Sequence, residues 1–273
     1  MYEKYWGLSE PPFSLTPDPR FLYLSRKHED CLTLLLHAIT RNKGAVMLTG
    51  EVGHGKTTLS RRLLQELDEA EYRVVLIVNP IMTPIQLIRE ILEQLGVGEN
   101  LPKNRQALLK LLNEKLLEFH QQGQKVVLVI DEAHLLRDRQ TFEEMRLLLN
   151  FQLNDRFLIS LVLIGQPELI PKVERIPALK QRLAVRANLK PLDLVETGEM
   201  LRHRLAAAWH SQNGRGVFSP EAVQEIYRYT NGCPRIICEV ADNALLVGMA
   251  QKARVIDGFL MHSVIMDFEG REW

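Results

Sequence analysis

Residues 50–57 are the first group whose types and spacing could carry out chemistry. They read Gly-Glu-Val-Gly-His-Gly-Lys-Thr, which fits the phosphate-loop pattern G-x-x-x-x-G-K-[ST]. Glycines in such a loop let the backbone approach a ligand closely, so that its N–H groups can cradle phosphate oxygens. We expect Lys56 to reach the β- and γ-phosphates and the Thr57 hydroxyl to ligate Mg²⁺. The expected nucleotide-binding residues here are Gly50, Glu51, Val52, Gly53, His54, Gly55, Lys56, Thr57 and Thr58.

A second group follows the apolar run 126–130, Val-Val-Leu-Val-Ile, with Asp131, Glu132, Ala133 and His134. A short, mostly β-branched run of this kind predicts a strand buried on both faces of a parallel sheet. Open α/β sheets bind ligands at the carboxyl ends of their strands. We therefore expect Asp131 to hold Mg²⁺, directly or through water, and Glu132 to position and activate an attacking water. The two groups together predict ATP or GTP binding and hydrolysis.

The elements that must position these residues alternate between strand and helix. Strands are expected at about 44–49, 73–79, 125–131, 158–164 and 183–190, with helices between them. This alternation indicates an α/β fold with a parallel sheet. Thr83-Pro84-Ile85-Gln86 has the spacing of a helix capping box with proline at the first helical position.

After Pro191 the strand signals stop, and residues 193–211, 219–230 and 234–251 are expected to be helical. Ser219 followed by Pro220 is a good helix start. The chain is therefore divided into three expected parts. An aromatic, proline-rich segment covers residues 1–26, an α/β nucleotide-binding domain covers 27–191, and a small all-helical domain covers 192–273.

Composition bounds the class of protein. The 273 residues carry 34 basic and 34 acidic side chains, so the zero net charge gives no global argument for nucleic acid. Three cysteines are too few for a disulfide framework and lack the spacing of a zinc site, so we interpret them as buried apolar residues. No signal peptide and no run of about 18 apolar residues is visible, which favours a soluble, cytoplasmic protein without a membrane span.

Four further stretches carry a resemblance. They are Leu161-Val162-Leu163-Ile164-Gly165-Gln166-Pro167-Glu168-Leu169, the run from Leu179-Lys180-Gln181-Arg182 to Leu192, Gly232-Cys233-Pro234-Arg235, and Pro12-Phe13-Ser14-Leu15-Thr16-Pro17-Asp18-Pro19-Arg20 with Tyr23-Leu24-Ser25. Together with the phosphate loop, they closely resemble the ExeA-like, GspA-type branch of the AAA+ ATPases over nearly the whole chain. The resemblance implies a P-loop AAA+ fold with a five-stranded parallel sheet and a helical lid domain. It also implies ATP, rather than GTP, as the nucleotide.

The resemblance implies roles for three more residues. Gln166 is similar to the polar sensor 1 residue that helps orient the attacking water. Arg182 is similar to the arginine finger that one subunit supplies to its neighbour's nucleotide, with Arg186 as the competing candidate and Lys180 as a weaker one. Arg235 is similar to sensor 2, which reaches the nucleotide from the helical domain.

The resemblance also implies a contact for the N-terminal segment, and the sequence differs from similar proteins in two respects. In similar proteins the N-terminal segment lies near the adenine, so Phe21 or Tyr23 could contact the base. His54 stands where similar proteins carry a small residue, and we expect its imidazole to face solvent; the alternative is a pH-sensitive phosphate contact. Similar secretion proteins continue into a membrane span and a periplasmic peptidoglycan-binding domain, whereas this sequence ends at Trp273. It is therefore expected to be either the cytoplasmic part of an inner-membrane protein or a soluble relative.

The sequence is compatible with three functions. The leading hypothesis is an ATPase that assembles into a homo-oligomeric ring or filament and remodels a protein partner in secretion or pilus machinery of a Gram-negative bacterium. The second is a DNA-associated regulator similar to the TniB/TnsC-type transposition ATPases, and the third is a module that binds ATP without turnover. In the second, phosphate contacts could come from Arg137, Arg139, Arg146 and Arg156 near the acidic strand, or from Arg202 and Arg204 in the helical domain. The alternative is that these arginines lie on solvated helix faces.

Overall fold

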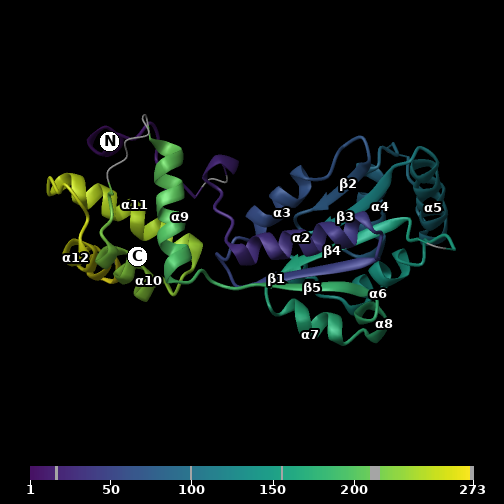
Figure 1. Cartoon of the computed structure of the whole chain (residues 1–273). Helices are drawn as coiled ribbons and strands as arrows, with labels where there is room; N and C mark the ends of the chain where they lie inside the picture. The colour runs from purple at the N-terminus through teal and green to yellow at the C-terminus, as the bar shows by residue number, and fades with distance from the viewer. Residues whose placement is uncertain (16–17, 99, 155, 210–215, 271–273) are drawn as a thin grey trace. The chain divides into compact units, whose positions relative to one another are not determined.

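The computed structural model describes residues 1–15, 18–98, 100–154, 156–209 and 216–270. They form two compact units, shown in Figure 1. One comprises His28–Val52 and Leu59–Leu189, and the other comprises Met1–Lys27, Gly53–Thr58 and Lys190–Trp273. Thr16 and Pro17 of the N-terminal motif, residues 210 and 211 of the predicted helix 193–211, and Trp273 lie outside the described residues.

The first unit is built on a five-stranded sheet with the order β2-β3-β4-β1-β5, in which all neighbouring strands are parallel. This confirms the predicted fold class, and each strand lies where an apolar run predicted one. The strands are β1 Ala45–Gly50, β2 Tyr72–Ile77, β3 Lys125–Ile130, β4 Ile159–Gly165 and β5 Leu183–Leu189.

Burial along the strands follows their place in the sheet. The three central strands, β3, β4 and β1, are buried along nearly their whole length, as expected for strands covered on both faces. The edge strands β2 and β5 alternate between buried and more exposed positions. The continuous apolar runs of β1, β3 and β4 therefore mark the centre of the sheet. The predicted site residues lie at the ends of these three strands.

Helices cover both faces of this sheet (Figure 1). One core joins alternate strand residues such as Met47, Leu128 and Leu163 to the helices α4 to α8, and α2 and α3 lie over the opposite face. The predicted capping box of α4 is confirmed, because Gln86 N–H donates to the Thr83 hydroxyl and Thr83 N–H donates to the Gln86 side chain. The helices are α2 Arg26–Thr40, α3 Lys56–Gln65, α4 Pro84–Gln94, α5 Arg105–Gln121, the 3₁₀ turn η2 Ala133–Leu135, α6 Arg139–Leu148, α7 Leu169–Glu174 and α8 Pro177–Lys180.

The second unit is helical. Its predicted helices at 219–230 and 234–251 are confirmed, and the Ser219 hydroxyl caps the first of them. A further helix, α12, was not predicted. It begins at a glycine, Gly258, and the apolar side chain that follows, Phe259, is 91% exposed, so its start does not show the usual pattern of an amphipathic helix. The elements are α1 Glu3–Trp6, the 3₁₀ turn η1 Pro19–Phe21, α9 Leu194–Ala208, α10 Pro220–Thr230, α11 Pro234–Ala250 and α12 Gly258–Glu269.

The N-terminal segment packs into the core of this helical unit. Phe13 and Phe21 are buried there, and the Trp6 indole N–H donates to the Leu245 carbonyl at 2.9 Å. The predicted helix 193–211 is too long, because α9 ends at Ala208 and Trp209 instead forms an antiparallel bridge with Leu8. The aromatic residues of the segment thus complete an apolar core, as their composition predicted.

Gly232 gives a stability prediction for the helical unit. Its φ is +74°, and a Cβ there would lie 1.9 Å from the Leu192 carbonyl oxygen. We expect Gly232→Ala to lower the free energy of unfolding by about 4 kcal/mol, since strain in a left-handed conformation adds to an unavoidable clash. Gly7→Ala is the matched control, because Gly7 has a φ of +75° but no atom within 4 Å of the added carbon. Equal melting temperatures for the two variants would contradict the prediction.

Candidate nucleotide-binding site

Three adjacent strands end at one edge of the sheet with the predicted site residues. In the strand order, β4 lies between β1 and β3, with Thr49 opposite Gly165 and Ile130 opposite Leu163. Because the strands are parallel, their carboxyl ends share this edge. Gly50 at the start of the glycine loop, Asp131 after β3 and Gln166 after β4 therefore follow neighbouring strands.

The glycine loop leads directly into α3. Gly53 and Gly55 have φ angles of +81° and +87°, which side-chain-bearing residues rarely adopt. α3 begins at Lys56, which is 6% exposed, and the next residue, Thr57, is exposed. The strand, loop and helix order that defines a phosphate loop is thus present, with its positive helix end at the loop.

Within the helical unit, residues 53–58 of the loop contact the start of α11. The Arg235 N–H donates to the Gly53 carbonyl at 3.3 Å, and a Cβ on Gly53 would lie only 2.7 Å from the Cys233 sulfur. The Arg235 guanidinium donates from Nε to Glu239 at 3.2 Å. Gly53 is therefore required for close approach, and the proposed sensor 2 residue lies beside the loop.

His54 differs from the prediction. The sequence suggested a solvent-facing imidazole, but the residue is buried, with 9% of its surface exposed. The reason is that the loop does not stand free as a glycine turn: Gly53, next to His54, packs against Cys233 and Arg235. The expectation of a solvated side chain is therefore wrong.

The acidic pair after β3 is held by backbone contacts. Asp131 is 8% exposed, and its N–H continues the sheet by donating to the Ile77 carbonyl at 2.9 Å. The Glu132 N–H donates to an Asp131 carboxylate oxygen at 2.9 Å. Glu132 itself has φ 50° and ψ 34°, a left-handed conformation that costs about 1–3 kcal/mol and marks a constrained position.

The structure adds two residues that sequence reasoning did not assign. His134 Nδ1 lies 3.2 Å from a Glu132 carboxylate oxygen and accepts from the Gln166 backbone N–H at 3.3 Å. The Lys172 ammonium donates to the carbonyls of His134 and Leu136, the latter at 2.9 Å. The Asp-Glu-Ala-His sequence contained the signal for His134, whereas nothing local pointed to Lys172.

Arg182 lies at the amino-terminal ends of the strands, whereas the glycine loop of its own chain lies at their carboxyl ends. It immediately precedes β5, where Leu183 pairs with Ala45, whereas Gly50 pairs with Leu189. Six residue steps along a strand separate the two ends by about 20 Å. The Arg182 guanidinium donates to the Arg146 carbonyl at 3.0 Å and to the Asn150 side chain at 2.6 Å.

Arg186, the competing finger candidate, is exposed on the edge strand β5 and donates to the Lys180 carbonyl at 3.2 Å. The structure therefore brings neither arginine to the glycine loop of its own chain. Arg182 is anchored by two contacts within its unit, and Arg186 by one.

The arginines considered as DNA contacts are partly engaged inside the chain. Arg204, considered as a DNA contact, donates to the carbonyls of Pro12 and Ser14 at 3.1 and 3.2 Å, so it holds the N-terminal segment in place. Arg139 and Arg146 both pair with Glu143, at 3.8 and 2.7 Å. Arg137 and Arg202 are exposed, and so is Arg156.

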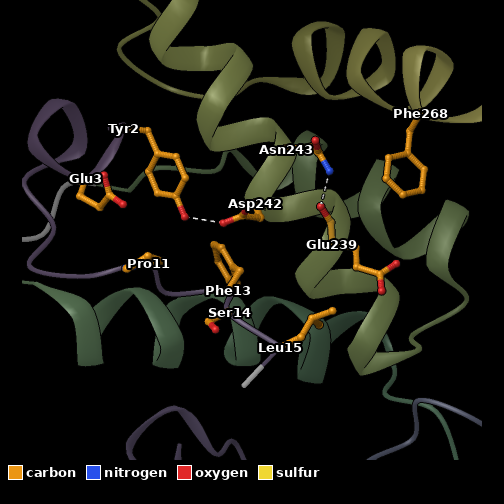
Figure 2. A pocket seen from close by; sticks show the side chains of 10 residues that line it. All are labelled: Tyr2, Glu3, Pro11, Phe13, Ser14, Leu15, Glu239, Asp242, Asn243 and Phe268. Atoms are coloured by element: carbon orange, nitrogen blue, oxygen red, sulfur yellow. Dashed lines mark hydrogen bonds between the residues drawn. The ribbon is translucent and has the colours of Figure 1, made fainter. Parts of the chain in front are cut away.

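A cavity of about 620 Å³ in the helical unit is a different kind of site (Figure 2). Figure 2 shows the Tyr2 hydroxyl donating to Asp242, with Glu239 one turn away on α11. Carboxylates repel phosphate groups, so this lining does not suit a nucleotide. The lining residues are Tyr2, Glu3, Pro11, Phe13, Ser14, Leu15, Glu239, Asp242, Asn243 and Phe268.

All three cysteines lie in buried positions. They are Cys31, Cys233 and Cys238, and none of the three forms a disulfide, as their spacing predicted. Burial raises the pKa of the Cys238 thiol to about 11 and also raises the pKa of Cys31. Because a thiol is reactive only as a thiolate, these two side chains are inert at neutral pH.

Comparison with known proteins identifies the class. Residues 39–173 match a family model described as an AAA domain. The fold matches the Aeropyrum pernix ORC2 protein with a TM-score of 0.68 at 15% identity, covering 97% of this chain and 75% of that one. It also matches Cdc6p from Pyrobaculum aerophilum with a TM-score of 0.65 at 20% identity, covering 90% and 67%. The chain therefore has the P-loop fold of the AAA+ class.

One relative is similar in sequence over nearly the whole chain. The chain is 39% identical over 260 residues to general secretion pathway protein A of Aeromonas hydrophila. The match covers 94% of this chain and 46% of that protein, so the chain spans about half of its relative's length. Over these 260 residues the chain is homologous to general secretion pathway protein A, which confirms the resemblance seen in its motifs. Within the described ranges, no helix combines the length and apolar composition needed to cross a bilayer.

Proposed function

We propose that this protein is a Mg²⁺-dependent ATPase. The observation that supports this most is the shared edge of β3, β4 and β1, where the acidic pair, Gln166 and the glycine loop follow three adjacent strands. The donor set fits a magnesium nucleotide, since a carboxylate and a hydroxyl are the hard oxygen ligands that Mg²⁺ prefers. The ORC2 structure that shares the fold is described as ADPNP–ADP complexes, which agrees with a nucleotide site.

In this proposal each residue of the candidate site has a stated role. The loop N–H groups and Lys56 bind the phosphates, and Thr57 with Asp131 would hold Mg²⁺, which neutralises charge on the transferred phosphoryl group when bound. Glu132 accepts a proton from the attacking water, which Gln166 helps to orient. Arg235 takes the sensor 2 role that the family resemblance implies and would contact the nucleotide.

We further propose that the active form is a homo-oligomer, as a ring or a filament. Arg182 lies about 20 Å along the sheet from the glycine loop of its own chain, so a finger role requires a neighbouring subunit. The partner would be a protein of secretion or pilus machinery, by analogy with the name of its relative. ATP is supplied in the cytoplasm, which is where we place this domain.

ATP turnover measured against protein concentration tests the proposal. We expect turnover per subunit to rise steeply with concentration for the wild type and to stay at background for Lys56→Ala, which cannot hold the phosphates. Turnover per subunit that does not change with concentration would contradict the oligomeric mechanism. Absence of turnover at every concentration would leave a module that only binds nucleotide.

Double-stranded DNA is the second variable in this assay. A DNA-associated regulator similar to transposition ATPases predicts strong stimulation by DNA and a steep salt dependence of binding. The zero net charge and the internal contacts of Arg139, Arg146 and Arg204 favour the protein partner. We therefore expect less than about a 2-fold effect of DNA at physiological salt, where nonspecific contacts are weak.

A further inference from the structure

His134 lies between two parts of the proposed hydrolysis site. Its ring nitrogen Nδ1 is 3.2 Å from a Glu132 carboxylate oxygen and 3.3 Å from the Gln166 backbone nitrogen. Glu132 follows β3 and Gln166 follows β4, so a single atom connects the loops after two neighbouring strands. The imidazole is largely enclosed, with 11% of its side chain exposed, which holds it in this position.

The chemistry of Nδ1 makes the two contacts compete. A neutral imidazole carries a hydrogen on one nitrogen and a lone pair on the other. When Nδ1 carries the hydrogen, it can donate to the Glu132 carboxylate but cannot accept from the Gln166 N–H. When Nδ1 carries the lone pair, it accepts from the Gln166 N–H and leaves the carboxylate without this donor. The tautomer is thus set by whichever neighbour forms the better hydrogen bond.

The surroundings hold both partners close to the ring. Gly165 precedes the β4 loop, and a Cβ on it would lie 3.1 Å from the His134 backbone nitrogen and 3.4 Å from Nδ1, so the loop backbone approaches the ring without a side chain between them. Lys172 holds the 3₁₀ turn in place by donating to the carbonyls of His134 and Leu136. Glu132 reaches this place from a left-handed backbone conformation. A small shift of the β4 loop would therefore change which bond Nδ1 forms.

We propose that His134 is a positioning residue, whose Nδ1 is shared between the Glu132 carboxylate and the Gln166 N–H and so couples the orientation of the water-activating carboxylate to the loop after β4. The inference rests on the proposed ATPase function and adds a residue to it. His134 itself touches neither nucleotide nor water in this role. It acts through Glu132.

A matched pair of substitutions tests this coupling. In His134→Asn the amide occupies the position of Nδ1, whereas in His134→Gln the amide moves out to the position of Nε2 and Nδ1 is lost. We expect His134→Gln to lower kcat by about 10- to 100-fold, the cost of a misplaced catalytic group, with the Kd of a fluorescent ATP analogue within about 2-fold of the wild type. We expect His134→Asn to retain kcat within about 3-fold, because one hydrogen bond through this position survives.

Two further arms separate a coupling role from a structural one. In a Glu132→Gln background, His134→Gln is expected to cause little additional loss, because residues that act as a unit are not additive. His37→Gln on α2 is the control, since His37 is exposed and contacts Lys43, and it should leave turnover unchanged. Melting temperatures of all variants check that each one is folded.

The outcomes are distinct. Wild-type turnover in His134→Gln, an equal fall in His134→Asn and His134→Gln, or a full additional loss in the Glu132→Gln background would each overturn the role of His134. Absence of turnover in the wild type would instead overturn the proposed function on which the inference rests. Full turnover in Glu132→Gln alone would overturn the base role of Glu132, through which His134 is proposed to act.

Discussion

Replacing Glu132 with glutamine is expected to lower kcat for ATP hydrolysis by about 10²- to 10⁴-fold, the usual contribution of a general base. Glutamine has nearly the size of glutamate but cannot accept the proton of the attacking water. The Glu132 backbone lies in a left-handed turn that the sheet and η2 hold, so the substitution leaves its position unchanged. Nucleotide binding is therefore expected to stay within about 2-fold of the wild type, which separates chemistry from affinity.

Single-turnover hydrolysis with a radiolabelled ATP and an equilibrium titration with a fluorescent analogue measure the two quantities. Glu174→Gln is the matched control, because Glu174 is an exposed carboxylate that pairs with Lys180 at 3.4 Å and lies outside the proposed site. A Glu132→Gln variant that hydrolyses ATP at the wild-type rate would assign the base role elsewhere. A variant that loses nucleotide affinity instead would place Glu132 among the binding groups.

The sequence predicted the local parts of this site because each part is a short continuous segment. The glycine loop at 50–57 and the strand that precedes Asp131 are defined by residues next to one another in the chain, and both lie where they were expected. Strand order is different, since it depends on pairing between distant segments. The placement of β4 between β1 and β3, which brings Gln166 to the same edge, could be anticipated only through the family resemblance.

The details that were missed or wrong all depend on tertiary contacts. His54 was expected in solvent but is buried. The neighbouring Gly53 packs against Cys233, which is 180 residues further along the chain. Arg204 was considered for DNA, but its guanidinium holds the N-terminal segment through the Pro12 carbonyl. The His134 contacts depend on the register of β3 against β4. No local pattern reports such contacts.

Arg182→Ala is expected to lower turnover of the assembled protein by about 10³-fold, in the range measured for arginine fingers. The substitution also removes two hydrogen bonds at the end of α6, to the Arg146 carbonyl and to Asn150, and we expect a loss of about 2 kcal/mol of stability. A fall in activity alone would therefore not separate the two roles of this side chain.

Asn150→Ala is the control for the structural role. It removes the 2.6 Å contact with Arg182 but leaves the guanidinium in place, so we expect a stability loss of about 1 kcal/mol with turnover within about 2-fold of the wild type. If Arg182 acts only by anchoring α6, Asn150→Ala should lower turnover in proportion to its loss of stability. The comparison is made at a temperature well below both melting transitions.

Mixing two inactive variants tests whether the arginine acts on a neighbouring subunit. Lys56→Ala lacks a working phosphate site but carries Arg182, whereas Arg182→Ala has the opposite defect. In a mixed assembly some interfaces join an intact phosphate site to an intact arginine, so turnover of the mixture is expected to exceed that of either variant alone by at least about 10-fold, given the size of a finger contribution. A mixture no more active than its components would contradict Arg182 as the finger. The same experiment with Arg186→Ala would then decide whether the exposed arginine on β5 takes that role.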